Sequence, residues 1–176
     1  MKGEFTMNQQ QKIRRFTSLG IFTSLVIIMT LFARIPMPQI KGYINLGDSM
    51  ILLGTLFFGG AFGAIIGSFG SALADVIGGY PNFAIFTFII KGIEPLIFAL
   101  LIRTGQKREY SIPRLLYGAT FAMLWMVAGY FWVEFFMFGA PAAFAEVPGN
   151  IIQAVGSIFI SIGLYNIVRN SLKTSS

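Results

Sequence analysis

The sequence of 176 residues contains no cysteine and no histidine. These absences exclude disulfides, thiol nucleophiles, imidazole bases and the usual zinc sites. A G-x-x-x-x-G-K-[ST] phosphate loop is also missing, so ATP hydrolysis by this chain is excluded. We therefore expect no enzyme activity, no metal site and no cofactor. The function classes that remain are binding, transport and assembly.

Charge is scarce as well. Charged residues make up 11% of the chain, whereas a water-soluble domain has about 25%. Hydrophobic residues make up 55%, and the mean hydropathy is +0.73. This balance predicts an integral membrane protein.

The apolar residues fall into six runs, and a helix of about 20 residues crosses about 30 Å of hydrocarbon. The runs are longer and more continuous than the alternating segments of about ten residues in membrane β-barrels. We predict an all-α membrane protein with six transmembrane helices in one compact bundle, residues 16–168, between polar tails at 1–15 and 169–176. The predicted helices are 16–33, 44–58, 61–78, 83–102, 115–138 and 150–168, with loops at 34–43 and 139–149.

Lysine and arginine are distributed unevenly between the two ends of these helices. Arg34 and Lys41 lie on one side, and Lys91 lies within a span. The remaining ten lie on the other side, which the positive-inside rule assigns to the cytoplasm together with both termini. The same rule accounts for the basic loop at 103–114, so no nucleic-acid partner is expected. The ten are Lys2, Lys12, Arg14, Arg15, Arg103, Lys107, Arg108, Arg114, Arg169 and Lys173.

Ionisable residues within the predicted spans lie at a common level. Asp48, Asp75 and Glu134 are near the outer ends of their helices, and Lys91 and Glu94 lie roughly 12 and 17 Å deep. A charge in hydrocarbon costs at least about 2.5–3.5 kcal/mol, so these side chains should pair or face water. This pattern predicts a polar pocket that opens to the outside.

Lys91 and Glu94 are three residues apart and share a helix face. Two interpretations remain open: an internal ion pair that holds helices together, or groups that bind a ligand. Asp75 is expected to face protein as a structural partner of Lys91, with Asp48 as the alternative.

Aromatic and amide side chains lie at the same level. Tyr80, Tyr130 and Trp132 either anchor the helices at the membrane interface or offer flat surfaces to a planar ligand. Asn150 and Gln153 share a face and supply paired donors and acceptors, although Asn150 would also suit a helix cap.

Small residues mark two further helix faces. Gly59, Gly63, Gly67 and Ser71 recur every fourth residue, which permits close helix packing. Gly20 and Ser24 form a small-x-x-x-small pair in the uncharged inner half, where another membrane helix would dock.

Five stretches together resemble the substrate-binding S components of energy-coupling factor (ECF) vitamin transporters. The resemblance covers residues 12–170 and is greatest for the branch assigned to hydroxymethylpyrimidine, a thiamine precursor, with pyridoxine carriers as near relatives. The stretches are GYINLGD at 42–48, FFG at 57–59, SALAD at 71–75, IKGIE at 90–94 and PGNIIQ at 148–153.

The resemblance implies a six-helix bundle in a prokaryotic plasma membrane. It would bind a vitamin from outside, with a transmembrane coupling protein and two cytoplasmic ATPases as partners. The segment 34–43 would be its lid, and Gly20 and Ser24 would occupy the docking motif, which usually has alanines. The candidate binding residues are Asn45, Tyr80, Lys91, Glu94, Tyr130, Trp132, Glu134, Asn150 and Gln153.

Two alternative functions remain: an S component for pyridoxine or another water-soluble vitamin, and a non-transporting membrane scaffold subunit. A scaffold would need no outward pocket.

Overall fold

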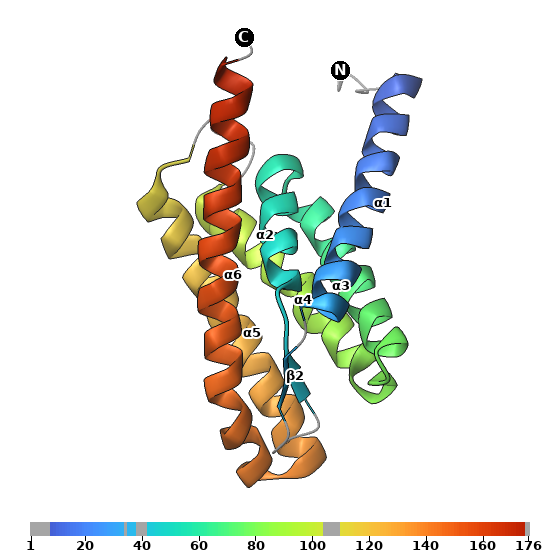
Figure 1. Ribbon diagram of the computed structural model, residues 1–176, viewed down its shortest axis with the longest axis vertical. Helices are drawn as coiled ribbons and strands as arrows, with labels where there is room; N and C mark the ends of the chain where they lie inside the picture. The colour runs from blue at the N-terminus through green and yellow to red at the C-terminus, as the bar shows by residue number, and fades with distance from the viewer. Residues whose placement is uncertain (1–7, 34, 38–41, 104–109, 175–176) are drawn as a thin grey trace, which may run out of the picture.

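The computed structural model describes residues 8–33, 35–37, 42–103 and 110–174, and along them the chain forms six helices and a short hairpin (Figure 1). The predicted helical bundle is confirmed, with a small sheet added to it. The elements are α1 (Gln9–Phe32), β1 (Ile35–Met37), β2 (Gly42–Ile44), α2 (Gly47–Phe58), α3 (Gly60–Ile77), α4 (Pro81–Ile102), α5 (Ile112–Phe138) and α6 (Ala140–Thr174).

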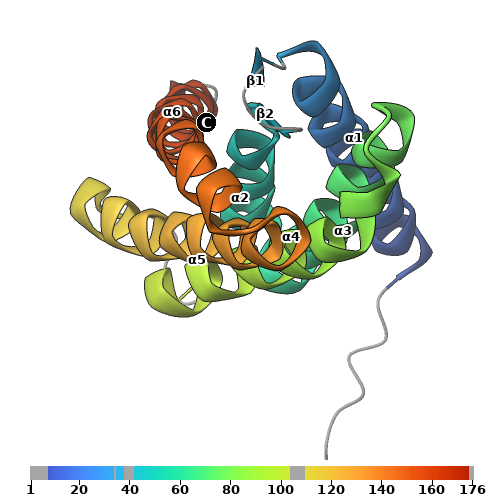
Figure 2. The same cartoon turned by 90° about the horizontal axis from the view of Figure 1, so that it is seen from below.

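Helix α2 lies at the centre of the bundle. Figure 2 shows α1, α3, α4, α5 and α6 in an arc around it, with the hairpin between α6 and α1. Helix α2 contacts α1, α3, α4 and α6, and residues 47–56 are all buried. The amino end of α1 and the carboxyl end of α6 lie at one end of the bundle, which we call the terminal end. The hairpin lies toward the other end, the hairpin end (Figure 1).

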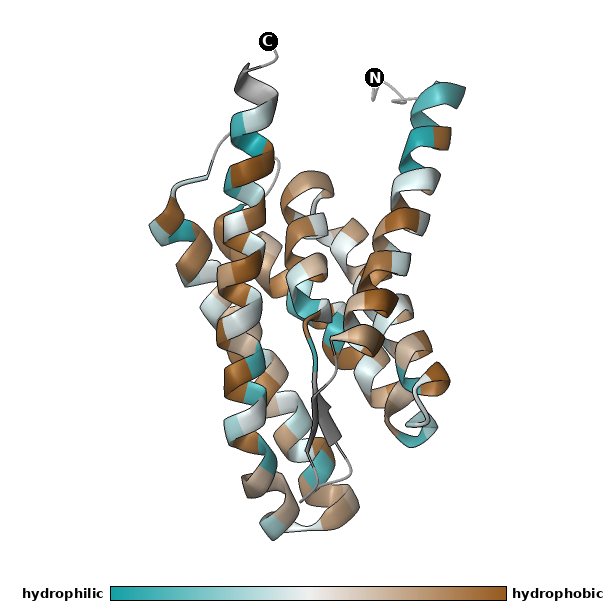
Figure 3. Ribbon diagram, viewed as in Figure 1, coloured by the Kyte–Doolittle hydropathy of each residue, from teal (hydrophilic) through white to brown (hydrophobic). Residues whose placement is uncertain are grey.

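The outer surface of the bundle is apolar. Large side chains such as Phe32, Phe136 and Leu100 are 86%, 79% and 76% exposed. Figure 3 shows hydrophobic residues along the helices and hydrophilic ones at the terminal ends of α1 and α6. A monomer in water rarely exposes so much apolar surface, whereas lipid is the expected solvent for it.

Helix α2 is shorter than the other spans. Among the described residues, five helices are long and apolar enough to cross a membrane, namely α1 and α3 to α6. The 12 residues of α2 extend over only about 18 Å. The extended backbone before Gly47 continues the crossing, and such backbone is tolerated at membrane depth where protein covers it. The amino end of α2 is thereby placed inside the bundle.

Two predicted loops differ from the structure. Residues 140–149 are helical, because Pro141 lies in the first turn of α6, where its missing N–H is not needed, and Pro148 is accommodated within the helix. The loop predicted at 34–43 includes the antiparallel pairing of Pro36 with Tyr43 and of Met37 with Gly42. Residues 34 and 38–41 of the predicted lid lie outside the described residues.

Helices α3 and α4 approach closely along the predicted glycine stripe. A Cβ atom at Gly67 would lie 2.2 Å from the carbonyl oxygen of Lys91, and one at Gly63 would lie 2.7 Å from Cβ of Pro95. These two glycines therefore allow the two helix backbones to come into contact. The contact at Gly67 is with the backbone of Lys91, the buried lysine of α4.

Candidate functional site

A cavity opens in the half of the bundle nearest the hairpin end. It contains about 390 Å³ of space free of atoms, a volume that includes the part open to solvent. Its walls come from α3 to α6 and from the extended segment before α2. The lining residues are Asn45, Asp75, Tyr80, Phe83, Thr87, Tyr130, Glu134, Glu146, Asn150 and Gln153.

A hydrogen-bonded network joins the cavity wall to the core. The Gln153 side-chain oxygen accepts from the backbone N–H of Asn45 at 2.8 Å, and the Gln153 amide donates to Asp48 at 2.8 Å. The Asn45 side chain in turn accepts from the backbone N–H of Gly47 at 2.9 Å. The network thus fixes the amino end of α2 to α6.

Lys91 forms an internal ion pair. Its ammonium group donates to Asp48 and, at 3.4 Å, to Glu94, and all three side chains are buried. The predicted pairing with Asp75 is wrong, because Asp75 lines the cavity while the first turn of α2 places Asp48 against Lys91. Lys91 and Glu94 are not among the cavity-lining residues, so their contacts favour the ion-pair interpretation.

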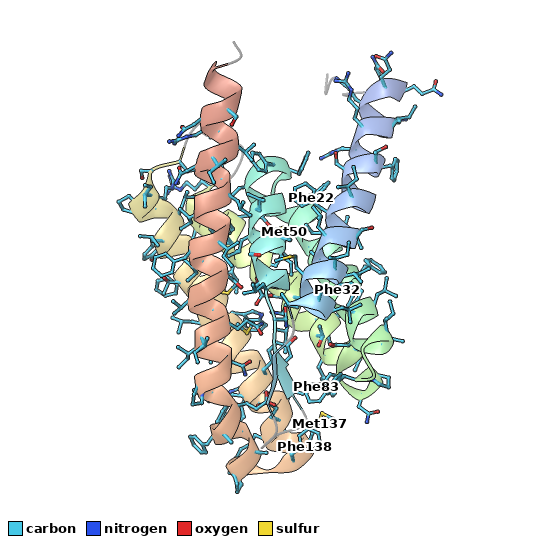
Figure 4. The ribbon with its side chains drawn as sticks, in the orientation of Figure 1. Phe22, Phe32, Met50, Phe83, Met137 and Phe138 are labelled. Carbon is cyan, nitrogen blue, oxygen red and sulfur yellow. The ribbon has the colours of Figure 1, made fainter. Side chains whose placement is uncertain are left out.

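Aromatic side chains form one wall of the cavity. The Tyr130 hydroxyl donates to Thr87 at 3.1 Å, and its ring lies 5.4 Å from Nζ of Lys91. Phe83 and Phe138 lie together at the hairpin end, with ring centroids 5.9 Å apart (Figure 4). Tyr80 completes the aromatic lining.

Trp132 lies outside this wall. It is 55% exposed and is absent from the cavity lining, and its ring stacks on that of Phe136 with centroids 6.0 Å apart. On α5, Tyr130 and Glu134 are one helical turn apart, whereas Trp132 lies between them and faces the opposite side. Its exposed position suits the alternative of a membrane anchor.

Two carboxyl groups meet in the cavity wall. Glu134 on α5 and Glu146 on α6 are both buried, and both line the cavity. Within the described part of the chain, Oε2 of Glu134 and Nδ2 of Asn150 are buried without a hydrogen-bond partner. An unpaired buried polar group costs about 1–3 kcal/mol, so this donor and this acceptor are available to a ligand.

Six of the nine candidate binding residues meet in the cavity. Glu146 was not predicted, because prolines on both sides indicated a loop. Its spacing from Asn150 and Gln153, at four and seven residues, would have placed all three on one helical face. Asn150 lies inside α6 and therefore is not a helix cap. The six are Asn45, Tyr80, Tyr130, Glu134, Asn150 and Gln153.

The fold and its cavity define a multi-pass helical membrane protein with a polar cavity in the bundle. The family model described as "ECF-type riboflavin transporter, S component" matches residues 10–170. The chain belongs to this family of ECF transporter S components, as the five sequence stretches indicated. It is therefore a transport component of the membrane rather than an enzyme.

Two individual relatives are similar to this chain over most of its length. A "Thiamine precursor transporter HmpT" of Lactococcus lactis subsp. cremoris is 32% identical over 146 residues, covering 82% of this chain and 81% of that protein. An uncharacterized protein from Pyrococcus woesei is 40% identical over 147 residues, covering 84% and 96%.

A solved structure confirms the fold. The S component in "Structure and mechanism of the S component of a bacterial ECF transporter" superposes with a TM-score of 0.75 at 20% identity, covering 94% of this chain and 99% of that one.

Proposed function

We propose that the chain is the S component that captures hydroxymethylpyrimidine for ECF-driven uptake. The observation that carries the proposal is the cavity with an unpartnered donor and acceptor beside aromatic rings. The relative with a thiamine-precursor name supports the same class of substrate.

The hairpin end would face the outside and the terminal end the cytoplasm. The described cations Lys12, Arg14, Arg15 and Arg169 lie in the terminal-end parts of α1 and α6, in agreement with the positive-inside rule. The cavity then receives its ligand from outside. A transmembrane coupling protein and two ATPases would supply the energy, because this chain has no phosphate loop of its own.

Direct binding tests the substrate. The purified protein, shown to be folded by size-exclusion chromatography, is titrated with radiolabelled hydroxymethylpyrimidine, pyridoxine and riboflavin. We expect saturable binding of hydroxymethylpyrimidine. Binding of riboflavin or pyridoxine without it would overturn the proposed substrate and would favour the riboflavin description of the family or the pyridoxine alternative.

Asn150→Ala should weaken this binding about 10-fold, because one hydrogen bond to the ligand is lost. The fold should persist, since Nδ2 of Asn150 has no protein partner to lose among the described residues. The matched control is Trp132→Phe on the exposed face of α5, which should bind as the wild type does. Equal affinity of wild type and Asn150→Ala would remove Asn150 from the site.

Gly20 and Ser24 would form the docking face on α1. Both are exposed, and nothing lies within 4 Å of a Cβ atom at Gly20. Gly20→Leu should therefore leave folding and binding unchanged, yet block close approach of a coupling helix and reduce uptake in cells that contain the coupling module. Ala128→Leu, at an exposed position on α5, is the control for added bulk. Normal uptake by Gly20→Leu would argue against docking here.

A further inference from the structure

The placement of Glu134 and Glu146 together in the cavity wall has no obvious structural purpose. Both side chains are buried, at 2% and 9% exposure, in a region surrounded by lipid-facing helices. Two carboxyl groups in contact repel each other when both are ionised, and burial strengthens that repulsion. In the described part of the chain, both salt bridges belong to Lys91, which pairs with Asp48 and Glu94 instead.

The cavity lining shares this negative character. Glu134 and Glu146 both line it, and none of the described lining residues is lysine or arginine. Such a wall favours a ligand that brings hydrogen-bond donors or positive charge, and it disfavours an anion.

The unpartnered atoms define an edge of the ligand. Asn150 lies one helical turn after Glu146 on α6, and Glu134 faces Glu146 from α5. Nδ2 of Asn150 is a buried donor, and Oε2 of Glu134 is a buried acceptor. A ligand that satisfies both atoms has a hydrogen-bond acceptor next to a hydrogen-bond donor along one edge. A ring nitrogen beside an exocyclic amino group has this arrangement.

We propose that Glu134, Glu146 and Asn150 form a subsite for the amino-bearing edge of a nitrogen heteroaromatic ring. Asn150 donates to the ring nitrogen, and the carboxyl pair accepts from the exocyclic amine. Tyr80, Phe83 and Tyr130 contact the ring itself. This inference rests on the proposed capture of a small heteroaromatic solute, and it adds which chemical group of that solute is selected.

The subsite also predicts discrimination against phosphate esters. A phosphate group carries about −1.5 to −2 charge near pH 7, and the carboxyl groups of Glu134 and Glu146 offer it no counter-charge. The unphosphorylated heterocycle should therefore be bound in preference to its phosphate ester.

The test compares hydroxymethylpyrimidine with the analogue in which an oxo group replaces the amine, and with its phosphate ester. Titrations use wild type, Glu134→Gln and Glu146→Gln. We expect wild type to prefer the amino compound about 10-fold or more over both. Glutamine at either position should reduce that preference, because a primary amide adds a donor where the ligand needs an acceptor.

Glu94→Gln serves as the matched control, because it neutralises a buried carboxyl group that does not line the cavity. It should lower thermal stability and leave the preference intact. A merely structural carboxyl pair would instead change stability in Glu134→Gln and Glu146→Gln without changing the ratio of affinities.

The possible outcomes separate this subsite from the proposed substrate. Equal binding of the amino and oxo compounds, or an unchanged preference in Glu134→Gln and Glu146→Gln, overturns the subsite and leaves vitamin capture standing. Binding of a different amino-bearing heterocycle, such as thiamine, in place of hydroxymethylpyrimidine corrects the substrate and supports the subsite if glutamine removes the preference. Binding only of ligands without an amino edge, or of no compound tested, overturns both.

Discussion

Replacing Lys91 with methionine is expected to remove most of the folded protein. Lys91 and its two partners Asp48 and Glu94 are 2%, 1% and 0% exposed. Loss of the ammonium group would leave two carboxyl groups without a counter-charge. Breaking a buried pair in this way costs about 3–5 kcal/mol, which is a large part of a typical stability of about 5–15 kcal/mol. The yield of monodisperse protein and its melting temperature in detergent measure the effect.

A double variant separates charge from shape. Lys91→Met combined with Asp48→Asn removes one of the stranded carboxylates, while the side-chain oxygen of the introduced asparagine can still accept from Gln153. We expect the double variant to melt at a higher temperature than Lys91→Met alone. Normal folding of Lys91→Met with weakened ligand binding would instead favour the interpretation in which Lys91 binds the ligand.

Gly67→Ala is expected to destabilise the bundle although alanine is the better helix former. The added methyl group would lie 2.2 Å from the carbonyl oxygen of Lys91 and 3.3 Å from Cγ2 of Ile51. Because the nearest obstacle is backbone, α3 and α4 must separate, and such overpacking costs about 1–3 kcal/mol or more. The separation would also displace Lys91 from Asp48. Thermal unfolding of the purified variant measures the loss.

Gly20→Ala is the control for the glycine itself. No atom lies within 4 Å of its Cβ position, so only the gain in helix propensity remains. Its melting temperature should equal or exceed that of the wild type. A Gly67→Ala protein as stable as the wild type would show that α3 and α4 do not need the close contact.

The level of the cavity in the bundle could be predicted from the sequence more easily than the residues that line it. Lipid excludes unpaired charge, so polar side chains at one depth had to face protein or water, and Glu134, Asn150 and Gln153 lie accordingly. Depth alone does not say which way a helix is rotated. Trp132 has the right depth and faces outward, and helical spacing from Tyr130 and Glu134 already separates it from them.

The prolines of the 139–149 segment were the main source of error. They were interpreted as loop residues, although proline is acceptable in the first turn of a helix and is tolerated further along when neighbouring groups compensate. Because these residues were predicted to form a loop, Glu146 was not assigned to the face of any helix. Its position near Glu134 in the cavity wall depends on the packing of α5 against α6, and no local sequence pattern predicts that packing.

The amino-acid order alone determined the membrane class, the helical bundle and the family, because the length of each apolar run must match the thickness of the lipid. Three-dimensional packing decided the partner of Lys91, the lining of the cavity and the half-length of α2 at the centre. In the sequence, Asp48 and Asp75 are both aspartates near the outer ends of predicted helices, and the sequence does not distinguish their roles. Their roles diverge because α2 and α3 present them to different neighbours, and the rotation of each helix is set by contacts with the rest of the bundle.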